Sequence, residues 1–124
     1  MEFSRNRPIF LQIVEEMIRR IARGELLPGE QLPSVRELAT ELHVNPNTVQ
    51  KAYQELERRG IIFTMRGQGS FATENVSMIA GLRTQAAVEA ARRFMREARG
   101  LGLTAEETMA LLAALSKNEH KGSG

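Results

Sequence analysis

Several residue types that carry chemistry are missing from this chain or nearly so. Its 124 residues include no cysteine, aspartate or tryptophan, and the only histidines are His43 and His120. Without cysteine there is no disulfide framework, no thiol catalysis and no cysteine-ligated zinc. The histidines are too few and too far apart to suggest a metal site, and the glutamates do not cluster away from helix surfaces. We therefore expect no enzyme activity, no metal and no cofactor.

Long apolar runs are also missing. No stretch approaches the roughly 18 apolar residues of a membrane span, and the N-terminus lacks the basic-then-apolar layout of a secretory signal. Hydrophobic residues make up 42% of the chain, which is ordinary for a globular protein. We expect a soluble protein of the reducing cytoplasm, with no membrane partner.

Acidic residues are absent from two central segments. The net charge of +2 is by itself a weak argument for a nucleic-acid partner. However, no acidic residue occurs between Glu41 and Glu55, or between Glu57 and Glu74. Either these gaps arise by chance, or the two segments approach phosphate groups, which would repel carboxylates.

Hydrophobic periodicity predicts three helices in the first half of the chain. The first covers roughly 8–23. The second begins at Ser34, whose hydroxyl and the carboxylate of Glu37 form a reciprocal capping pair. The third begins after Asn45, a good cap, and has Pro46 at its first position.

The third predicted helix has two unlike faces. One is an apolar stripe of Val49, Ala52, Tyr53 and Leu56, and the other holds Asn47, Gln50, Lys51 and Gln54. The amides of Asn47 and Gln50 can pair with adenine, and Thr48 can meet a phosphate or a thymine methyl group. Lys51 suits a phosphate. The alternative is a polar helix surface without a ligand.

Two short strands are predicted over 61–64 and 70–73, around the tip MRGQG. Gly67 and Gly69 would allow positive φ angles at the tip, and Arg66 would anchor a phosphate. The alternative is a plain hairpin turn. Two short helices, a tight turn and a hairpin together predict a winged helix-turn-helix, which places its recognition helix in the major groove of duplex DNA.

A helix pair is predicted at the C-terminal end, over 77–99 and 105–116, with Thr104 and Glu107 as a second capping pair. A unit this small needs a partner to enclose a core. We therefore expect homodimerisation; the alternative is that the pair folds back on the winged domain. The residues assigned to the dimer interface are Leu82, Ala86, Ala90, Phe94, Met95, Leu111, Leu112 and Leu115.

The predicted fold is thus mainly α-helical with a small β-hairpin. Residues 1–74 form the winged helix-turn-helix DNA-binding domain, and residues 75–117 form the two-helix dimerisation domain. Residues 118–124 form a disordered tail, because they are polar and lack an apolar periodicity.

Several segments resemble the DNA-binding domain of GntR-type bacterial transcription regulators. They are PGE at 28–30, LPSVRELA at 32–39, VNPNTV at 44–49 and RGQG at 66–69. The short C-terminal helix pair, with GLTAEE at 102–107, is similar to the smallest branch of the family, the YtrA type.

The resemblance implies a homodimeric regulator, usually a repressor, that binds an inverted repeat and often controls a transporter operon. Together with the analysis of the faces, it gives the candidate DNA-binding residues Ser34, Arg36, Asn45, Asn47, Thr48, Gln50, Lys51, Arg66, Gly67, Gln68 and Gly69. Better-studied branches have arginines at the positions of Pro46 and Gln50, so their guanine contacts do not transfer to this chain.

Arg36 is a candidate on physical grounds as well. It lies in the first turn of a predicted helix, where the helix dipole disfavours a cation by a few tenths of a kcal/mol, about 0.3 or more. A phosphate or a guanine edge would supply acceptors for its guanidinium group. The alternative is a solvated arginine that pairs with Glu37 or Glu41.

These observations predict a sequence-specific, dimeric transcription regulator whose partner is double-stranded DNA with a pseudo-palindromic operator. A winged-helix protein-binding module is the alternative, and it would expose apolar residues on the outer face of the third helix. No small-molecule effector is identified by the residues. Any such ligand would lie at the dimer seam or between domains, because two helices do not readily enclose a drug-sized pocket.

Overall fold

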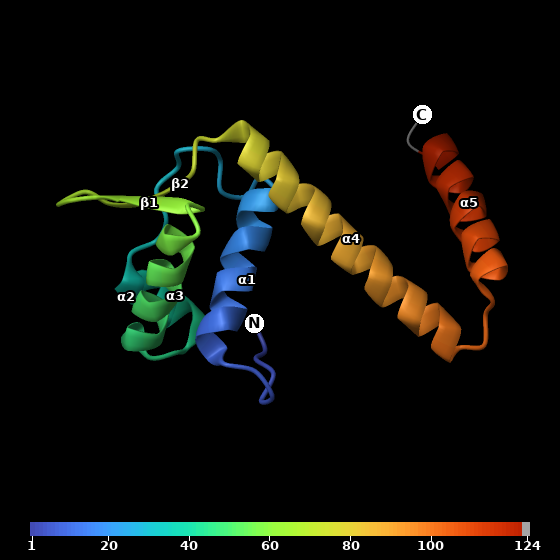
Figure 1. The fold of residues 1–124 in the computed structure, drawn as a ribbon, viewed down its shortest axis with the longest axis horizontal. Coiled ribbons are helices and arrows are strands. Elements are labelled where there is room, and N and C mark those ends of the chain that lie inside the picture. Colours follow the sequence, from blue (N-terminus) through green and yellow to red (C-terminus); the bar gives the residue numbers. More distant parts are fainter. Residues whose placement is uncertain (123–124) are drawn as a thin grey trace. The chain divides into compact units, whose positions relative to one another are not determined.

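The structure is a computed structural model that describes residues 1–122. In this part of the chain it contains the helices α1 (Ile9–Ala22), α2 (Val35–Leu42), α3 (Pro46–Arg58), α4 (Val76–Gly100) and α5 (Ala105–Gly122). An antiparallel hairpin of β1 (Ile62–Met65) and β2 (Gly69–Ala72) follows α3 (Figure 1). The predicted fold class is confirmed. None of the described helices is long and apolar enough to cross a membrane.

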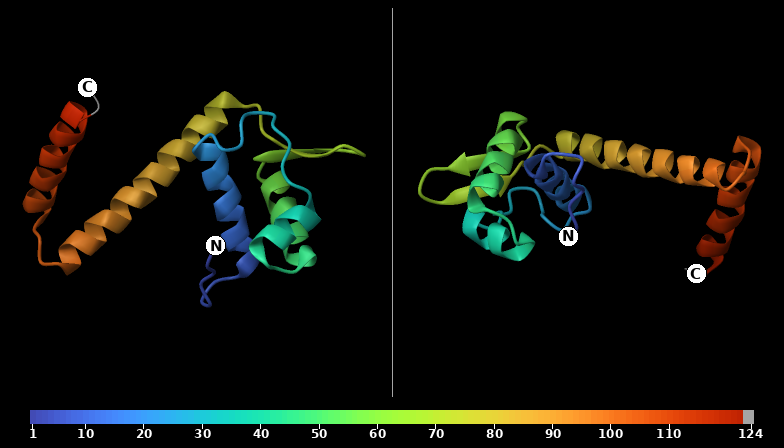
Figure 2. Two further views of the ribbon diagram at one scale, coloured as in Figure 1. Left: turned by 180° about the vertical axis from the view of Figure 1, so that it is seen from behind. Right: turned by 90° about the horizontal axis from the view of Figure 1, so that it is seen from below.

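The chain forms two compact units, Met1–Ala86 and Ala87–Gly124. In the first, α1, α2 and α3 lie side by side and the hairpin projects away from them (Figure 2). The largest fully buried side chains of its core are Ile13, Met17, Ile21, Leu38, Leu56, Val14 and Val49. Burial of each such side chain contributes about 1.5–3 kcal/mol, so the three helices hold one another through these residues.

The starts of α2 and α3 are fixed by caps, as predicted. The Glu37 amide donates to Ser34 Oγ at 3.1 Å, and the Ser34 amide donates to Glu37 Oε1 at 3.0 Å. At the start of α3 the Asn47 amide donates to Asn45 Oδ1 at 2.7 Å. Between the two helices His43 has a left-handed φ of 57° and ends α2.

The hairpin is paired from Ile62 with Ala72 to Met65 with Gly69, one residue closer to the tip than predicted. The shift arises because Gly69, at a φ of 115°, continues the ladder into the tip. The outer edge of β2 is also covered, by the segment that precedes α2. The Ala72 amide donates to the Glu30 carbonyl at 2.8 Å, and the Leu32 amide donates to the Ser70 carbonyl at 2.8 Å.

The beginning of α4 belongs to the first unit. Ile79 is buried there, and Leu82 packs against the core of the three helices. The Arg83 Nε donates to the Ala22 carbonyl at the end of α1, at 2.9 Å. The first unit therefore extends to Ala86, whereas the sequence analysis ended the winged domain at residue 74. The difference arises because the apolar side of the first turns of α4 covers the C-terminal end of α1.

The second unit contains the remainder of α4 and all of α5. The predicted capping pair is present: the Thr104 amide donates to Glu107 Oε1 at 2.9 Å, and the Glu107 amide donates to Thr104 Oγ1 at 3.1 Å. α5 continues to Gly122, so residues 118–122 are helical rather than disordered as predicted. The segment after Leu115 contains no proline and no glycine before Gly122, which explains the longer helix. Residues 123 and 124 of the predicted tail lie outside the described residues.

Candidate DNA interface

The outer face of α3, defined by Asn47, Gln50, Lys51 and Gln54, is exposed. Its opposite side is inaccessible to solvent, since the side chains of Val49, Ala52 and Leu56 are each 0% exposed. The polar face is therefore directed outward by the burial of the apolar one. Apart from Pro46, no apolar side chain of α3 is exposed, which disfavours a surface for binding another protein.

Arg36 lies exposed in the first turn of α2 and has no counter-ion among residues 1–122. The two carboxylates considered as its alternative partners are both engaged elsewhere. Glu37 caps α2, and Ser34 lowers the pKa of Glu37 by donating its backbone N–H to the carboxylate. Glu41 pairs with Arg20. The guanidinium group of Arg36 therefore keeps its donors available for an external anion.

Unlike Arg36, the arginines at the C-terminal end of α3 are paired with a carboxylate. Arg58 Nε donates to Glu55 Oε1 at 2.9 Å, and Arg59 Nε donates to Glu55 Oε2 at 2.6 Å. The hydrogen bond from Arg58 and the one from Arg59 hold the pKa of Glu55 at about 2. Because Glu55 partly neutralises both arginines, positive charge on this helix is concentrated at Lys51.

The hairpin tip presents its four candidate residues, Arg66, Gly67, Gln68 and Gly69, to solvent. Gln31, in the segment before α2, supports the tip by donating from Nε2 to the Gln68 carbonyl at 2.7 Å. Gly69 has a φ of 115°, which favours glycine, and a Cβ atom added there would lie 2.7 Å from Gln31 Nε2, so the end of the Gln31 side chain would have to move. The sequence analysis missed Gln31, whose role depends on a pairing across 37 residues.

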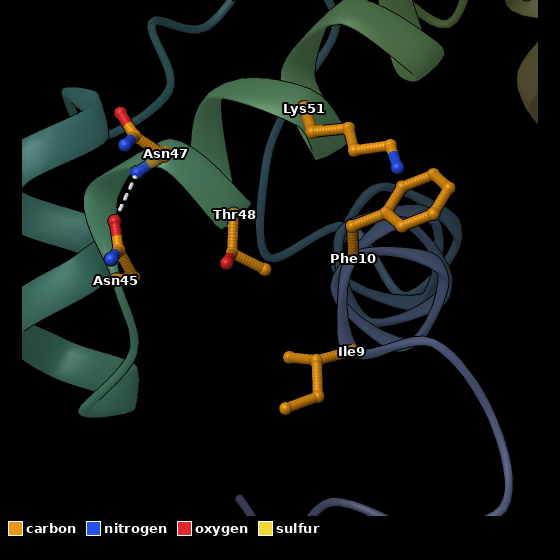
Figure 3. Close-up of a pocket in the computed structure, with 6 residues that line it drawn as sticks. All are labelled: Ile9, Phe10, Asn45, Asn47, Thr48 and Lys51. Atoms are coloured by element: carbon orange, nitrogen blue, oxygen red, sulfur yellow. Dashed lines mark hydrogen bonds between the residues drawn. The ribbon is translucent and has the colours of Figure 1, made fainter.

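Lys51 lies at an open recess between α1 and α3. The recess has a volume of about 460 Å³ and is lined by Ile9, Phe10, Asn45, Asn47, Thr48 and Lys51. Figure 3 shows the Lys51 side chain extending from α3 toward the ring of Phe10. Its Nζ lies 4.1 Å from the ring centroid. Phe10 falls within the first predicted helix and was not among the candidate DNA-binding residues.

Tyr53 is buried, in agreement with its place in the predicted apolar stripe. The hydroxyl donates to the Pro33 carbonyl at 2.7 Å, and burial raises the pKa of Tyr53. The carbonyl is within reach because α3 packs on the start of α2. This hydrogen bond joins α3 to Pro33, the residue before the cap of α2.

The candidate dimer residues of α5 are accessible. Leu111, Leu112 and Leu115 are exposed by 41, 40 and 49%. In α4, Phe94 and Met95 are half-buried and Ala90 is exposed. Buried side chains in the second unit include Ala98 and Thr108. Within the second unit, α4 therefore leaves an apolar face of α5 uncovered.

No group of three or more histidines and glutamates is placed to hold a metal ion among the side chains that the structure describes, which end at residue 119.

Comparison with known proteins places these features in a family. Residues 10–72, from α1 to the end of β2, match the family described as bacterial regulatory proteins, gntR family. The chain is 44% identical over 108 residues to YhcF of Bacillus subtilis (strain 168), an uncharacterized HTH-type transcriptional regulator; the match covers 87% of this chain and 89% of YhcF. It is 56% identical over 68 residues to the HTH-type transcriptional repressor YtrA of the same strain, covering 55% of this chain and 52% of YtrA.

Solved structures are similar to this chain over most of its length, and one of them was solved in complex with operator DNA. A GntR family transcriptional regulator from Listeria monocytogenes has a TM-score of 0.77 and 40% identity, covering 90% of this chain and 98% of the other. The DNA-binding domain of AraR, solved in complex with the operator ORR3, has a TM-score of 0.53 and 30% identity over 59% of this chain and 86% of the AraR chain. The chain therefore belongs to the GntR family and is a DNA-binding transcription regulator rather than an enzyme.

Proposed function

We propose that the protein is a homodimeric repressor that binds an inverted-repeat operator through α3 of each copy. The observation that carries the proposal is the outer face of α3, which is polar and exposed above a fully buried apolar side. A helix of this kind fits the major groove, where each base pair presents its own pattern of donors and acceptors.

The candidate contacts divide into two kinds. Asn47 and Gln50 carry amides that can pair with base edges, and adenine is their best partner. Arg36, Lys51 and Arg66 bind phosphates, because none of the three has a carboxylate partner among residues 1–122. The remaining candidates, Ser34, Asn45, Thr48, Gly67, Gln68 and Gly69, position the backbone or contact sugar and phosphate.

The dimer is supported by the exposed apolar face of α5. Three exposed leucines on one side of a helix are typical of a surface that binds another protein. In a two-fold dimer, α3 of each copy would then contact one half-site of the operator. The recognition helices of such dimers enter successive major grooves about 34–36 Å apart, or a multiple of this distance. Binding across a promoter would then exclude RNA polymerase.

Repression is supported by the names of relatives, which include the repressor YtrA. The family resemblance favours a transporter operon near the protein's own gene as the target. The protein would act in the cytoplasm, where bacterial DNA is accessible. No effector is assigned.

Three measurements test the proposal: sedimentation, footprinting and titration of DNA duplexes. Sedimentation at micromolar concentration should give a dimer, and footprinting of the region upstream of the protein's gene should give one protected, pseudo-palindromic site. Equal binding to genuine and scrambled duplexes across a range of salt concentrations would refute sequence-specific recognition. A monomer at these concentrations would refute the dimer alone.

A further inference from the structure

The Lys51 ammonium group does not extend freely into solvent. It lies over the face of the Phe10 ring, 4.1 Å from the centroid (Figure 3). A ring face is the negative part of an aromatic side chain, so it attracts a cation and restricts where that cation rests. Phe10, from α1, thus orients Lys51, the one lysine of α3.

The ring is itself fixed in place. Phe10 is half-buried and packs against the core of the first unit. The segment before α1 is tied to Gln12, a buried side chain: its Nε2 donates to the carbonyls of Ser4 and Arg7 at 2.8 and 2.9 Å, and its Oε1 accepts from the Ser4 amide at 2.8 Å. The ring is therefore held against the core at the start of α1.

The recess beside this pair suits an anion. None of its six lining residues is acidic, and Thr48, one helical turn before Lys51 on α3, lines the same recess. An ammonium group that rests on a ring face still has N–H donors directed away from the ring. A phosphate at the recess would accept from the ammonium group through one oxygen and from the Thr48 hydroxyl group through another.

We propose that Phe10 is a positioning residue for DNA binding, whose ring holds the Lys51 ammonium group at the recess between α1 and α3. There the ammonium group and the Thr48 hydroxyl group bind one backbone phosphate of the strand that passes the start of α3. The inference rests on the proposed function and deepens it, because it gives α1 a part in the DNA interface.

The competing explanation is that Phe10 acts only by packing. Four variants separate the two. Phe10→Tyr keeps the ring face, Phe10→Leu keeps an apolar side chain without it, and Lys51→Ala removes the cation. Phe3→Leu is the matched control, because Phe3 is also half-buried against the same core, whereas the ring under the Lys51 ammonium group is that of Phe10.

The experiment uses the full chain and a duplex that the wild-type protein selects from a random-sequence library. The dissociation constant is measured at several salt concentrations, with thermal unfolding as a check on folding. Phe10→Leu should weaken binding by about three- to tenfold at low salt, whereas Phe10→Tyr and Phe3→Leu should bind like the wild type. Lys51→Ala should lower the slope of log K against log salt by about 0.9 for each protomer bound.

The double variant Phe10→Leu with Lys51→Ala tests whether the ring acts through the lysine. If the ring acts through the lysine, Phe10→Leu should have no further effect once Lys51 is alanine. The proposal is overturned if Phe10→Leu binds like the wild type, or if it weakens the Lys51→Ala variant by the same factor as it weakens the wild type.

A second measurement needs no change at Phe10, in case Phe10→Leu fails to fold. In the wild-type protein the side-chain protons of Lys51 next to Nζ should show an upfield ring-current shift in the NMR spectrum. If these protons resonate at their random-coil positions, the proposal is overturned. Every duplex carries phosphates, so the effect of Phe10→Leu with and without Lys51 can also be measured at low salt on DNA of shuffled sequence. If the wild-type protein selects no sequence from the library, that result would count only against the proposed function.

Discussion

The Tyr53 hydroxyl group donates to the Pro33 carbonyl at 2.7 Å, and this bond joins α3 to the residue that precedes the cap of α2. Tyr53→Phe should therefore lower the free energy of unfolding by about 0.5–1.5 kcal/mol, the usual net value of one such bond. Urea unfolding of the two proteins measures the difference. The salt dependence of DNA binding should not change, and a changed slope would mean that Tyr53 does more than join the helices.

The tip of the wing depends on glycine at residue 69. Gly69→Ala places a methyl group at a φ of 115° and 2.7 Å from Gln31 Nε2, so Gln31 must leave its bond to the Gln68 carbonyl. We expect a loss of stability of about 1 kcal/mol or more and weaker DNA binding. Gly67→Ala is the comparison, because no atom lies within 4 Å of its added Cβ. Equal effects of the two changes would show that backbone strain alone is responsible.

Base reading and phosphate binding should separate on the outer face of α3. Asn47→Ala or Gln50→Ala should reduce the preference for particular base pairs by about 1–3 kcal/mol. Lys51→Ala should weaken binding to all sequences. Titration of the operator and of single-base variants at two salt concentrations distinguishes these effects. Uniform losses for all three variants on every duplex would contradict the division.

The apolar face of α5 should be required for dimerisation. Leu112→Glu places a charge on this face and should produce monomers in sedimentation, with loss of operator binding at the same protein concentration. Ala113→Glu, at an exposed position one residue further along α5, should leave the dimer intact. Monomers in both variants would mean that charge anywhere on the helix is disruptive.

Glu55 should contribute stability that depends on pH. Its pKa falls from the ordinary value of 4.5 to about 2 in the folded protein, because Arg58 and Arg59 donate to it. The contribution is therefore present above about pH 4.5 and is lost as the pH falls toward 2. Glu55→Gln removes this contribution, so the difference in unfolding free energy between variant and wild type should shrink over that interval. A difference that is constant with pH would exclude the ion pairs as its source.

The caps, the helix starts and the outer face of α3 could be predicted from the sequence, because residues within four positions of each other determine them. Ser34 with Glu37 and Thr104 with Glu107 are examples. The supports of the interface could not be predicted in this way. The Tyr53 bond spans 20 residues and the Gln31 bond spans 37, so they depend on how helices and hairpin pack.

The same limit applies to the ends of elements. The predicted stop of the last helix at residue 116 was based on the end of apolar periodicity, but the polar segment that follows contains no proline, and no glycine before Gly122, to end the helix. The boundary between the units was placed at residue 74 because composition changes there. Composition could not reveal that Ile79 and Leu82 pack against the first unit.

The segment before α2 has a consequence for how the wing behaves in a concentrated solution. Because the backbone of Glu30 and Leu32 already occupies the outer hydrogen-bonding groups of β2, that side of the hairpin cannot recruit a strand from another molecule. Only β1 keeps an unpaired edge, and it is four residues long. The wing can thus remain thin enough to approach a groove without becoming a nucleus for aggregation.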